Sequence, residues 1–277
     1  MENSPIAAHE YDTFRHYLED ACGIVLGENK HYLVTSRLKR VAEDFLFPSL
    51  SEMMSTLVKG NDKKLRETVI DAMTTNETMW FRDVYPFEIL KKDLLPELAK
   101  NNAPIRVWSA ASSTGQEAYS ISMSVSEFQK SNPGKLSSKV EIVGTDISQT
   151  VVNQAKSGCY DELSVIRGLS TERRDKFFTK KDDSWQLQQE IMMRARFTEL
   201  NLLSNYTLLG QFDIIFCRNV LIYFSSEMKK DILERMAKTL KPGGTLILGG
   251  SESPTGYTKA FAMVRYGDGV VYRLHDN

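Results

Sequence analysis

From residue 105 onwards, short apolar segments alternate with amphipathic segments, and this alternation limits the possible folds more than any other feature of the chain. The amphipathic segments show the three- and four-residue spacing of helices, whereas the apolar segments have the length and composition of buried strands. Strands that alternate with helices are joined by right-handed crossovers into a mainly parallel sheet. We therefore predict an α/β fold with a doubly wound, Rossmann-like sheet. The predicted strands are residues 105–109, 140–146, 212–217 and 245–248, and the predicted helices are residues 87–98, 116–127, 148–157 and 227–240.

Two regions of this α/β part depart from simple alternation. Between residues 173 and 197, two short runs alternate polar with apolar residues, which is typical of strands with one buried face. We predict a small antiparallel β insertion there, of which one part rejoins the main sheet. Near the C-terminus, residues 260–265 and 270–274 are expected to pair across a turn at Gly267–Gly269, and Lys241–Gly244 is expected to turn the chain into the last parallel strand.

The first 75 residues are predicted to be helical, because their apolar residues recur at three- and four-residue spacing. In the first helix this pattern runs from Tyr11 to Val25, and Gly27 is expected to end it. Three more helices are predicted at residues 34–45, 51–58 and 62–73. The change of pattern predicts an all-helical N-terminal domain at residues 1–75 and an α/β domain at residues 76–277, with the β insertion at about residues 173–197.

The composition excludes several classes of protein. Lys plus Arg number 35 and Asp plus Glu number 36, so no net positive field attracts nucleic acid or an anionic membrane surface. No apolar run approaches the roughly 20 residues of a membrane span, and the N-terminus lacks the pattern of a signal peptide. Cys22, Cys159 and Cys217 are odd in number and far apart, which favours reduced thiols over disulfides or a zinc site. We expect a cytoplasmic protein that holds no metal, binds no nucleic acid and does not insert into a membrane.

The segment Thr74–Asp83, which joins the two predicted domains, has an unusual composition for a connection. It contains uncharged hydrogen-bonding side chains, two aromatic residues and one arginine. Linkers are ordinarily rich in glycine, proline, serine or charged residues. The segment therefore has the character of a ligand-contacting element.

Further candidate residues follow the predicted strands, because a ligand of an open α/β sheet lies at the carboxyl ends of its strands. The loop Ala110–Glu117 lacks the repeated glycines that seat a pyrophosphate, and Glu117 at the helix start would repel phosphate. By itself this loop fits an ordinary tight turn equally well. Asp146 ends the second strand, where a carboxylate can accept both ribose hydroxyls of an adenosine. The alternative role of Asp146 as a helix N-cap is less favoured, because Ser148 can cap the same helix.

The same features resemble those of class I S-adenosylmethionine-dependent methyltransferases. More narrowly, an all-helical N-terminal part followed by four motifs in order resembles the CheR family of chemotaxis receptor glutamate methyltransferases. The resemblance runs from Tyr11 to Leu274. The four motifs are residues 75–82 (TNETMWFR), 110–117 (AASSTGQE), 144–146 (GTD) and 216–224 (FCRNVLIYF).

This resemblance implies an activity and a set of site residues. The implied reaction moves a methyl group from S-adenosylmethionine to glutamate side chains of methyl-accepting chemotaxis receptors, leaving S-adenosylhomocysteine, in sensory adaptation. The implied partner is the cytoplasmic helical bundle of such a receptor, and we expect the enzyme to be a monomer. Cofactor-binding roles fall on Asn76, Thr78, Arg82, Glu117, Asp146, Asn201, Leu202, Asn219 and Val220, and catalytic roles on Arg82 and Tyr223.

The implied chemistry is consistent with the absence of histidine from these motifs. A glutamate side chain has an ordinary pKa of about 4.3, so at neutral pH it is already an ionised nucleophile. No general base is needed, and the reaction depends on alignment of the carboxylate oxygen with the methyl group. Arg82 could orient the acceptor carboxylate by a charge-assisted hydrogen bond. The alternative for Arg82 is a surface ion pair with Asp83 or Glu77.

Two regions bear on how a receptor would be held. Residues 30–42 contain several basic residues and no acidic one, so Arg37, Lys39 and Arg40 are candidates for docking an acidic receptor surface. The alternative is a solvated helix face, the usual meaning of such a run. In some CheR proteins the β insertion binds a receptor C-terminal pentapeptide and contains glycine in a connection. Residues 178–185 contain no glycine, which predicts a pentapeptide-independent member.

Two other functions are alternatives to this one. The first is another class I methyltransferase, acting on nucleic acid or a small molecule. Amino-directed nucleic-acid enzymes carry a Pro-Pro-aromatic motif after the fourth strand, whereas residues 218–221 read Arg-Asn-Val-Leu. A non-catalytic, cofactor-bound regulator on the same scaffold is disfavoured because the motif residues Asn76, Arg82, Asp146 and Tyr223 are all present.

Overall fold

The computed structural model describes residues 6–267 and 269–275 of the chain. By their internal contacts the residues form two compact units, one made of residues 1–75 and 223–228 and the other of residues 76–222 and 229–277. Two predictions concern residues outside the described ranges. One is the lack of a signal-peptide pattern at the N-terminus, which includes residues 1–5, and the other is the C-terminal turn, which includes Asp268.

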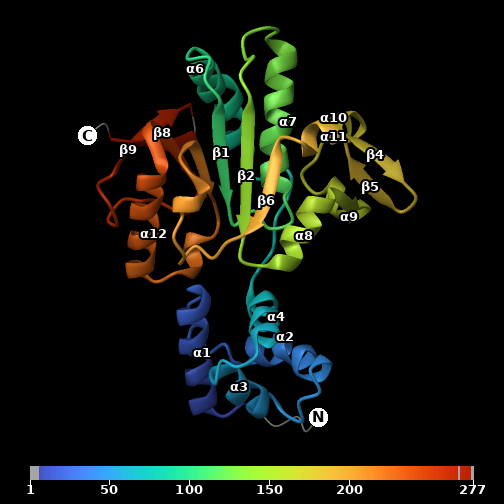
Figure 1. Cartoon of the computed structure of the whole chain (residues 1–277), viewed down its shortest axis with the longest axis vertical. Coiled ribbons are helices and arrows are strands. Elements are labelled where there is room, and N and C mark those ends of the chain that lie inside the picture. Colours follow the sequence, from blue (N-terminus) through green and yellow to red (C-terminus); the bar gives the residue numbers. More distant parts are fainter. Residues whose placement is uncertain (1–5, 268, 276–277) are drawn as a thin grey trace. The chain divides into compact units, whose positions relative to one another are not determined.

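The first unit is helical, as predicted. It contains α1 (Ala8–Cys22), α2 (His31–Asp44), α3 (Leu50–Val58) and α4 (Lys63–Met73), labelled in Figure 1. Each helix buries one apolar stripe, in which Phe14, Leu38 and Leu65 are fully buried. The predicted end of the first helix is wrong: Gly23, with φ of 79°, ends it four residues earlier than Gly27. A glycine takes this left-handed conformation without steric cost, which makes it a common helix end.

The second unit is built on a seven-stranded sheet in the order β6-β2-β1-β7-β8-β10-β9. The first five strands are parallel to their neighbours, and β10 is antiparallel to both β8 and β9. The prediction of a doubly wound, mainly parallel sheet is confirmed. The strands are β1 (Ile105–Ala110), β2 (Val140–Asp146), β6 (Ala195–Glu199), β7 (Phe212–Cys217), β8 (Leu240–Leu248), β9 (Phe261–Tyr266) and β10 (Gly269–Leu274).

Helices cover both faces of this sheet (Figure 1). The connections through α7 (Gln116–Ser131) and α8 (Gln149–Ser157) move towards the β6 edge, whereas the one through α12 (Ser226–Thr239) moves the other way. Right-handed crossovers in opposite directions place α12 on the face opposite α7 and α8. The Tyr119 hydroxyl of α7 donates to the Ala155 carbonyl of α8 at 2.7 Å, which joins the two helices on their shared face.

The helix that precedes β1 is irregular. It runs as α5 (Tyr85–Ile89), a π-helical turn η1 (Leu90–Leu94) and α6 (Leu95–Ala99) where one regular helix was predicted. Two short 3₁₀ turns, η2 (Thr207–Leu209) and η3 (Leu221–Tyr223), flank β7.

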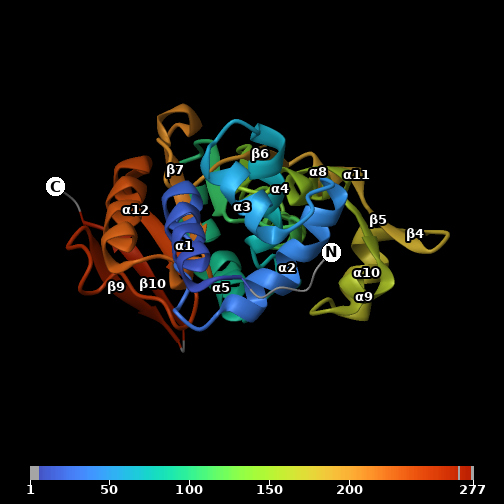
Figure 2. The ribbon, with the colours of Figure 1, turned by 90° about the horizontal axis from the view of Figure 1, so that it is seen from below.

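The predicted β insertion is larger than residues 173–197. A three-stranded antiparallel sheet has the order β3-β5-β4, and its first strand, β3 (Cys159–Asp161), precedes the predicted range. The other two strands are β4 (Phe178–Lys181) and β5 (Ser184–Leu187), and β6 rejoins the main sheet as predicted. Figure 2 shows this sheet beside α9 (Glu162–Ile166) and α10 (Thr171–Phe177); α11 (Gln189–Met192) follows β5.

The turn predicted at Lys241–Gly244 lies inside β8. Leu240 pairs with Phe212 and Thr245 pairs with Ile214, so these four residues face a single residue of β7 as a bulge. The glycines that predict a turn are equally compatible with a β-bulge, because both structures use backbone conformations that glycine adopts readily. In the described part of the chain, no helix is both long and apolar enough to cross a membrane.

Candidate active site

The carboxyl ends of β1, β2, β7 and β8 meet at one edge of the main sheet. The chain winds from β1 towards β2 and β6, and from β7 towards β8, so the direction of winding reverses between β1 and β7. Such a reversal is where an open α/β sheet binds its ligands. The loops after β1, β2 and β8, residues 218–222 after β7 and the segment 76–83 belong to the same compact unit.

Asp146 holds the loop that follows β1. Its buried carboxylate, 6% exposed, accepts hydrogen bonds from the Ser113 amide at 2.8 Å and from the Ser148 amide at 3.1 Å. The hydroxyl of Ser148 caps α8 by accepting from the Val151 amide at 3.2 Å. Asp146 therefore does not serve as the side-chain cap of that helix.

The loop after β1 has a constrained backbone. Ala111 and Ser113 have φ of 54° and 49°, and Gly115 has φ of 93°. A Cβ atom on Gly115 would lie 2.9 Å from that of Ala155, so both conformation and packing require glycine there. The Ser113 hydroxyl donates to the Asn76 carbonyl at 2.8 Å, which places Asn76 at this edge.

A buried guanidinium, that of Arg218, joins three segments of the site. Its side chain is 1% exposed and pairs with Glu117 at 3.0 Å and with Asp83 at 2.6 Å. It also donates to the Arg82 carbonyl at 2.8 Å. The other oxygen of Glu117 accepts from the Ser109 hydroxyl at 2.7 Å, so β1 and the start of α7 are tied to β7 and to residues 82–83. Arg218 was not predicted as a site residue. The sequence shows only that it is a charged residue directly after a buried strand.

The loop after β7 is held by a second residue that the sequence interpretation missed. The Glu252 carboxylate accepts hydrogen bonds from the amides of Asn219 at 2.7 Å, Val220 at 3.0 Å, Ile222 at 3.3 Å and Gly249 at 2.9 Å. A Cβ atom on Gly249 would lie 2.7 Å from the Glu252 carboxylate, so glycine is needed for this approach. Asn219 has φ of 58°, and four amides around one carboxylate stabilise that conformation.

Three buried polar atoms at this edge have no hydrogen-bond partner among the described residues. They are the side-chain oxygen Oδ1 of Asn219, the hydroxyl of Ser112 and the Nε atom of Arg218. Buried polar groups in proteins are nearly always hydrogen-bonded, so unpaired ones are informative. Their position at the strand ends fits a polar ligand bound there.

Arg82 is only loosely held. Its guanidinium donates to the Glu77 carbonyl at 3.3 Å, whereas the Glu77 carboxylate pairs with Arg167 at 2.7 Å and that of Asp83 pairs with Arg218. The hydrogen bond from Arg167 lowers the pKa of Glu77. The two carboxylates considered as surface partners of Arg82 are thus engaged by other arginines.

The remaining predicted site residues differ in their surroundings. Asn201 and Leu202 follow β6; the Asn201 side-chain oxygen accepts from the Leu203 amide at 2.9 Å, and Leu202 is buried. Thr78 is half-buried in the segment 76–83. Tyr223 groups with the helical unit, where its carbonyl accepts from the Val25 amide at 2.9 Å.

Of the three predicted docking residues, Arg37 has a structural role. Its guanidinium donates to the carbonyls of Met73 at 2.6 Å and Thr74 at 3.1 Å, and so satisfies the end of α4. Lys39 and Arg40 are exposed. Docking by basic residues of α2 is therefore better examined at Lys39 and Arg40.

Cys217 is a core residue. Its side chain is fully buried, and burial raises the pKa of the thiol. A thiol that stays protonated is a poor nucleophile. In the described ranges, no group of three or more His, Cys, Asp and Glu side chains could hold a metal ion.

We predict that Arg218→Met destabilises the α/β unit by about 3 kcal/mol, because it leaves the largely buried Glu117 carboxylate without its ionic partner. All three tryptophans of the chain lie in this unit, so their fluorescence during urea unfolding reports its stability. Arg196→Met is the matched control: Arg196 is 52% exposed, pairs with Glu141, and should cost at most about 1 kcal/mol. Equal losses in the two variants would contradict the special role of Arg218.

Comparison with known proteins agrees with this architecture. Residues 9–74 match the model of the CheR methyltransferase all-alpha domain, and residues 76–269 match that of the CheR methyltransferase SAM binding domain. The chain is 51% identical over 270 residues to the chemotaxis protein methyltransferase of Vibrio anguillarum, covering 97% of this chain and 98% of the relative. It is 50% identical over 270 residues to chemotaxis protein methyltransferase 1 of Vibrio cholerae, with 97% and 98% covered. It is also 50% identical over 267 residues to chemotaxis protein methyltransferase Cher2 of Pseudomonas putida, with 95% and 97% covered. The chain belongs to the CheR methyltransferase family.

Proposed function

We propose that this protein transfers a methyl group from S-adenosylmethionine to glutamate side chains of a chemotaxis receptor in the cytoplasm. The observation that carries the proposal is the match to both CheR domains together with about 50% identity to chemotaxis protein methyltransferases over nearly the whole chain. The products would be a glutamate methyl ester and S-adenosylhomocysteine.

The residues at the strand ends fit this cofactor. The unpaired oxygens of Asn219 and Ser112 offer acceptor sites to its amino or hydroxyl groups. Asp146 ends β2, where a carboxylate can accept the hydroxyls of a ribose, and the loop after β1 has none of the repeated glycines that a pyrophosphate needs. When bound, the cofactor supplies a methyl group activated by a sulfonium. The residues proposed to hold it are Asn76, Thr78, Arg82, Glu117, Asp146, Asn201, Leu202, Asn219 and Val220.

Glu117 is proposed to act at this site although both of its oxygens already accept hydrogen bonds. Each carboxylate oxygen can accept more than one hydrogen bond, so the Ser109 and Arg218 contacts leave Glu117 able to bind a cofactor group. Those contacts fix the carboxylate in one orientation. A preoriented carboxylate loses little conformational entropy when it binds a cationic amino group.

The acceptor needs orientation and exclusion of water, and it needs no base. Its carboxylate oxygen forms the new bond to the methyl carbon as the methyl–sulfur bond breaks, so opposite charges are neutralised. We propose that Arg82 orients this carboxylate, since among the described residues its guanidinium has one hydrogen bond, to the Glu77 carbonyl at 3.3 Å. Tyr223 is proposed to help position the same group by its phenol.

The first test is methyl transfer from labelled cofactor to a panel of receptor cytoplasmic fragments. Arg82→Ala should lower kcat by about 100- to 1,000-fold, the usual effect of removing a preorganised donor. Its affinity for S-adenosylhomocysteine should change far less. Arg265→Ala, which removes an exposed arginine of β9, is the control. A wild-type rate in Arg82→Ala would remove Arg82 from the mechanism, and an enzyme inactive on every receptor fragment would refute the proposed substrate.

The second test concerns docking of the acidic receptor surface on the helical unit. Replacing Lys39 and Arg40 by glutamine should raise KM for the receptor fragment about threefold to tenfold and flatten its salt dependence, because exposed charges steer association. Arg37 is left unchanged because it supports α4. The control replaces Lys63 and Lys64 of α4, which are exposed as well. Unchanged kinetics at low salt would count against docking on α2.

We also propose that methylation does not depend on a receptor C-terminal pentapeptide. The connection between β4 and β5 consists of Asp182 and Asp183 alone, without glycine, which supports this proposal. Calorimetry with a receptor C-terminal pentapeptide should show no binding at micromolar concentrations. Binding of S-adenosylhomocysteine in the same sample verifies that the protein is active. Micromolar affinity for the peptide would refute the prediction.

A further inference from the structure

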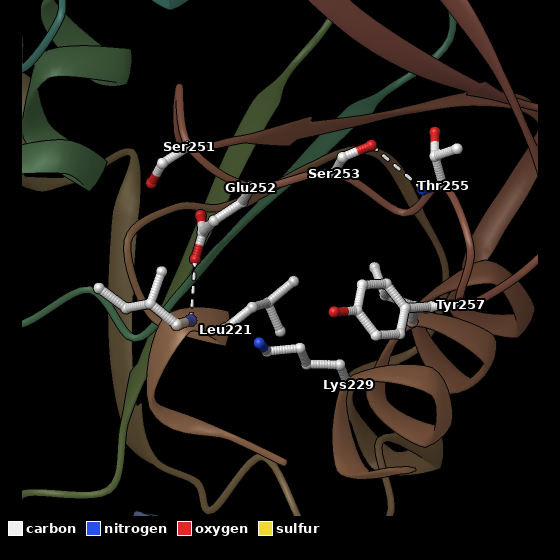
Figure 3. A pocket seen from close by; sticks show the side chains of 9 residues that line it. Leu221, Lys229, Ser251, Glu252, Ser253, Thr255 and Tyr257 are labelled. Atoms are coloured by element: carbon white, nitrogen blue, oxygen red, sulfur yellow. Dashed lines mark hydrogen bonds between the residues drawn. The ribbon is translucent and has the colours of Figure 1, made fainter. Parts of the chain in front are cut away.

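A small pocket of about 210 Å³ is formed by three segments. They are the loop that follows β7, the helix α12 and the segment after β8. Figure 3 shows the Lys229 ammonium group and the Tyr257 hydroxyl both pointing into the pocket. The apolar part of the lining includes Leu221 and Leu233. The pocket thus combines one cation, one carboxylate and several hydroxyl groups with an apolar wall.

The charge of Lys229 is available to a ligand. In the part of the chain that the structure describes, no carboxylate lies within ion-pair distance of Lys229, and its Nζ atom is 5.8 Å from the centre of the Tyr257 ring. A cation–π contact at this distance is weak. Glu252 also lines the pocket and keeps its negative charge, but its oxygens accept the four backbone amides described above. An anionic group can therefore pair with Lys229, which has no carboxylate partner among the described residues.

The volume of the pocket limits the size of the ligand that it can hold. Pockets for cofactors and other small molecules measure about 300–1,000 Å³, so a pocket of about 210 Å³ is too small for a nucleotide. It can hold one side chain. A carboxylate on a short aliphatic stem matches both the ammonium group and the apolar wall.

We propose that this pocket binds an acidic side chain of the acceptor protein, within one helical turn of the glutamate that is methylated. Val220, a proposed cofactor-binding residue, is followed directly by Leu221 of the pocket, and consecutive Cα atoms are about 3.8 Å apart. On a helix, residues one turn apart are separated by about 5–6 Å. A helix with one glutamate at the cofactor could therefore present a second acidic side chain, one turn away, to this pocket. The proposal rests on the proposed function and extends it to substrate selection.

The kinetic test uses Lys229→Gln in the full-length enzyme with a receptor cytoplasmic fragment. KM for the fragment should rise about threefold to tenfold, while kcat and affinity for S-adenosylhomocysteine stay unchanged, because an acid held away from the reacting centre contributes uniform binding. Lys230→Gln is the matched control, since Lys230 is the next residue of α12 and is exposed. The same KM in Lys229→Gln and wild type overturns the proposal.

A binding test separates this proposal from the proposed function. A helical peptide with glutamates one turn apart is compared with its glutamine counterpart by calorimetry. The wild type should bind the glutamate peptide about threefold to tenfold more tightly, and Lys229→Gln should show no preference. If this holds while no receptor fragment is methylated, the proposed function fails and the pocket assignment stands. No preference in the wild type, or an equal preference in Lys229→Gln, overturns the pocket assignment.

Discussion

The buried guanidinium of Arg218 is the interaction on which the arrangement of the site depends. It contacts Glu117 at the start of α7, the carboxylate of Asp83 and the carbonyl of Arg82. One cation, almost inaccessible to water, therefore joins three separate segments: residues 82–83, the start of α7 and the loop after β7 that carries Arg218 itself. Burying a charge is unfavourable unless it is paired and hydrogen-bonded. Any displacement of one segment would leave the guanidinium undercompensated, so each segment restrains the others.

The sheet and the strand-end residues could be predicted because their signals are local. Strands buried on both faces read as continuous apolar runs, and the predicted residues 140–146 and 212–217 are the observed β2 and β7. The carboxyl ends of parallel strands lie at one edge of the sheet. The predicted strands alone were therefore enough to place Asp146 and Asn219 at the same edge. The strand β3 was missed because three residues are too few to show a period.

The contacts that shape the site could not be predicted, because they join residues far apart in the chain. Arg218 lies 101 residues from Glu117 and 135 from Asp83, and Glu252 lies 33 residues from Asn219. A charged residue after a strand reads as an exposed loop residue, and only the folded chain shows it buried. The same limit applies to Arg37, whose place in a basic stretch predicted docking, whereas its guanidinium supports the end of α4.

The backbone at this edge is strained, and each strained loop is held by one charged side chain. Of the nine described non-glycine residues with positive φ, six lie in three segments at this edge: Phe81, Asp83 and Val84 before α5, Ala111 and Ser113 after β1, and Asn219 after β7. Such conformations cost about 1–3 kcal/mol each. A hydrogen bond to a charged group contributes about 1.5–3 kcal/mol, which offsets part of this cost. Arg218 holds the first segment, Asp146 the second and Glu252 the third. These contacts restrain the loops in their conformations, which lowers the free energy that a bound cofactor must contribute to order them.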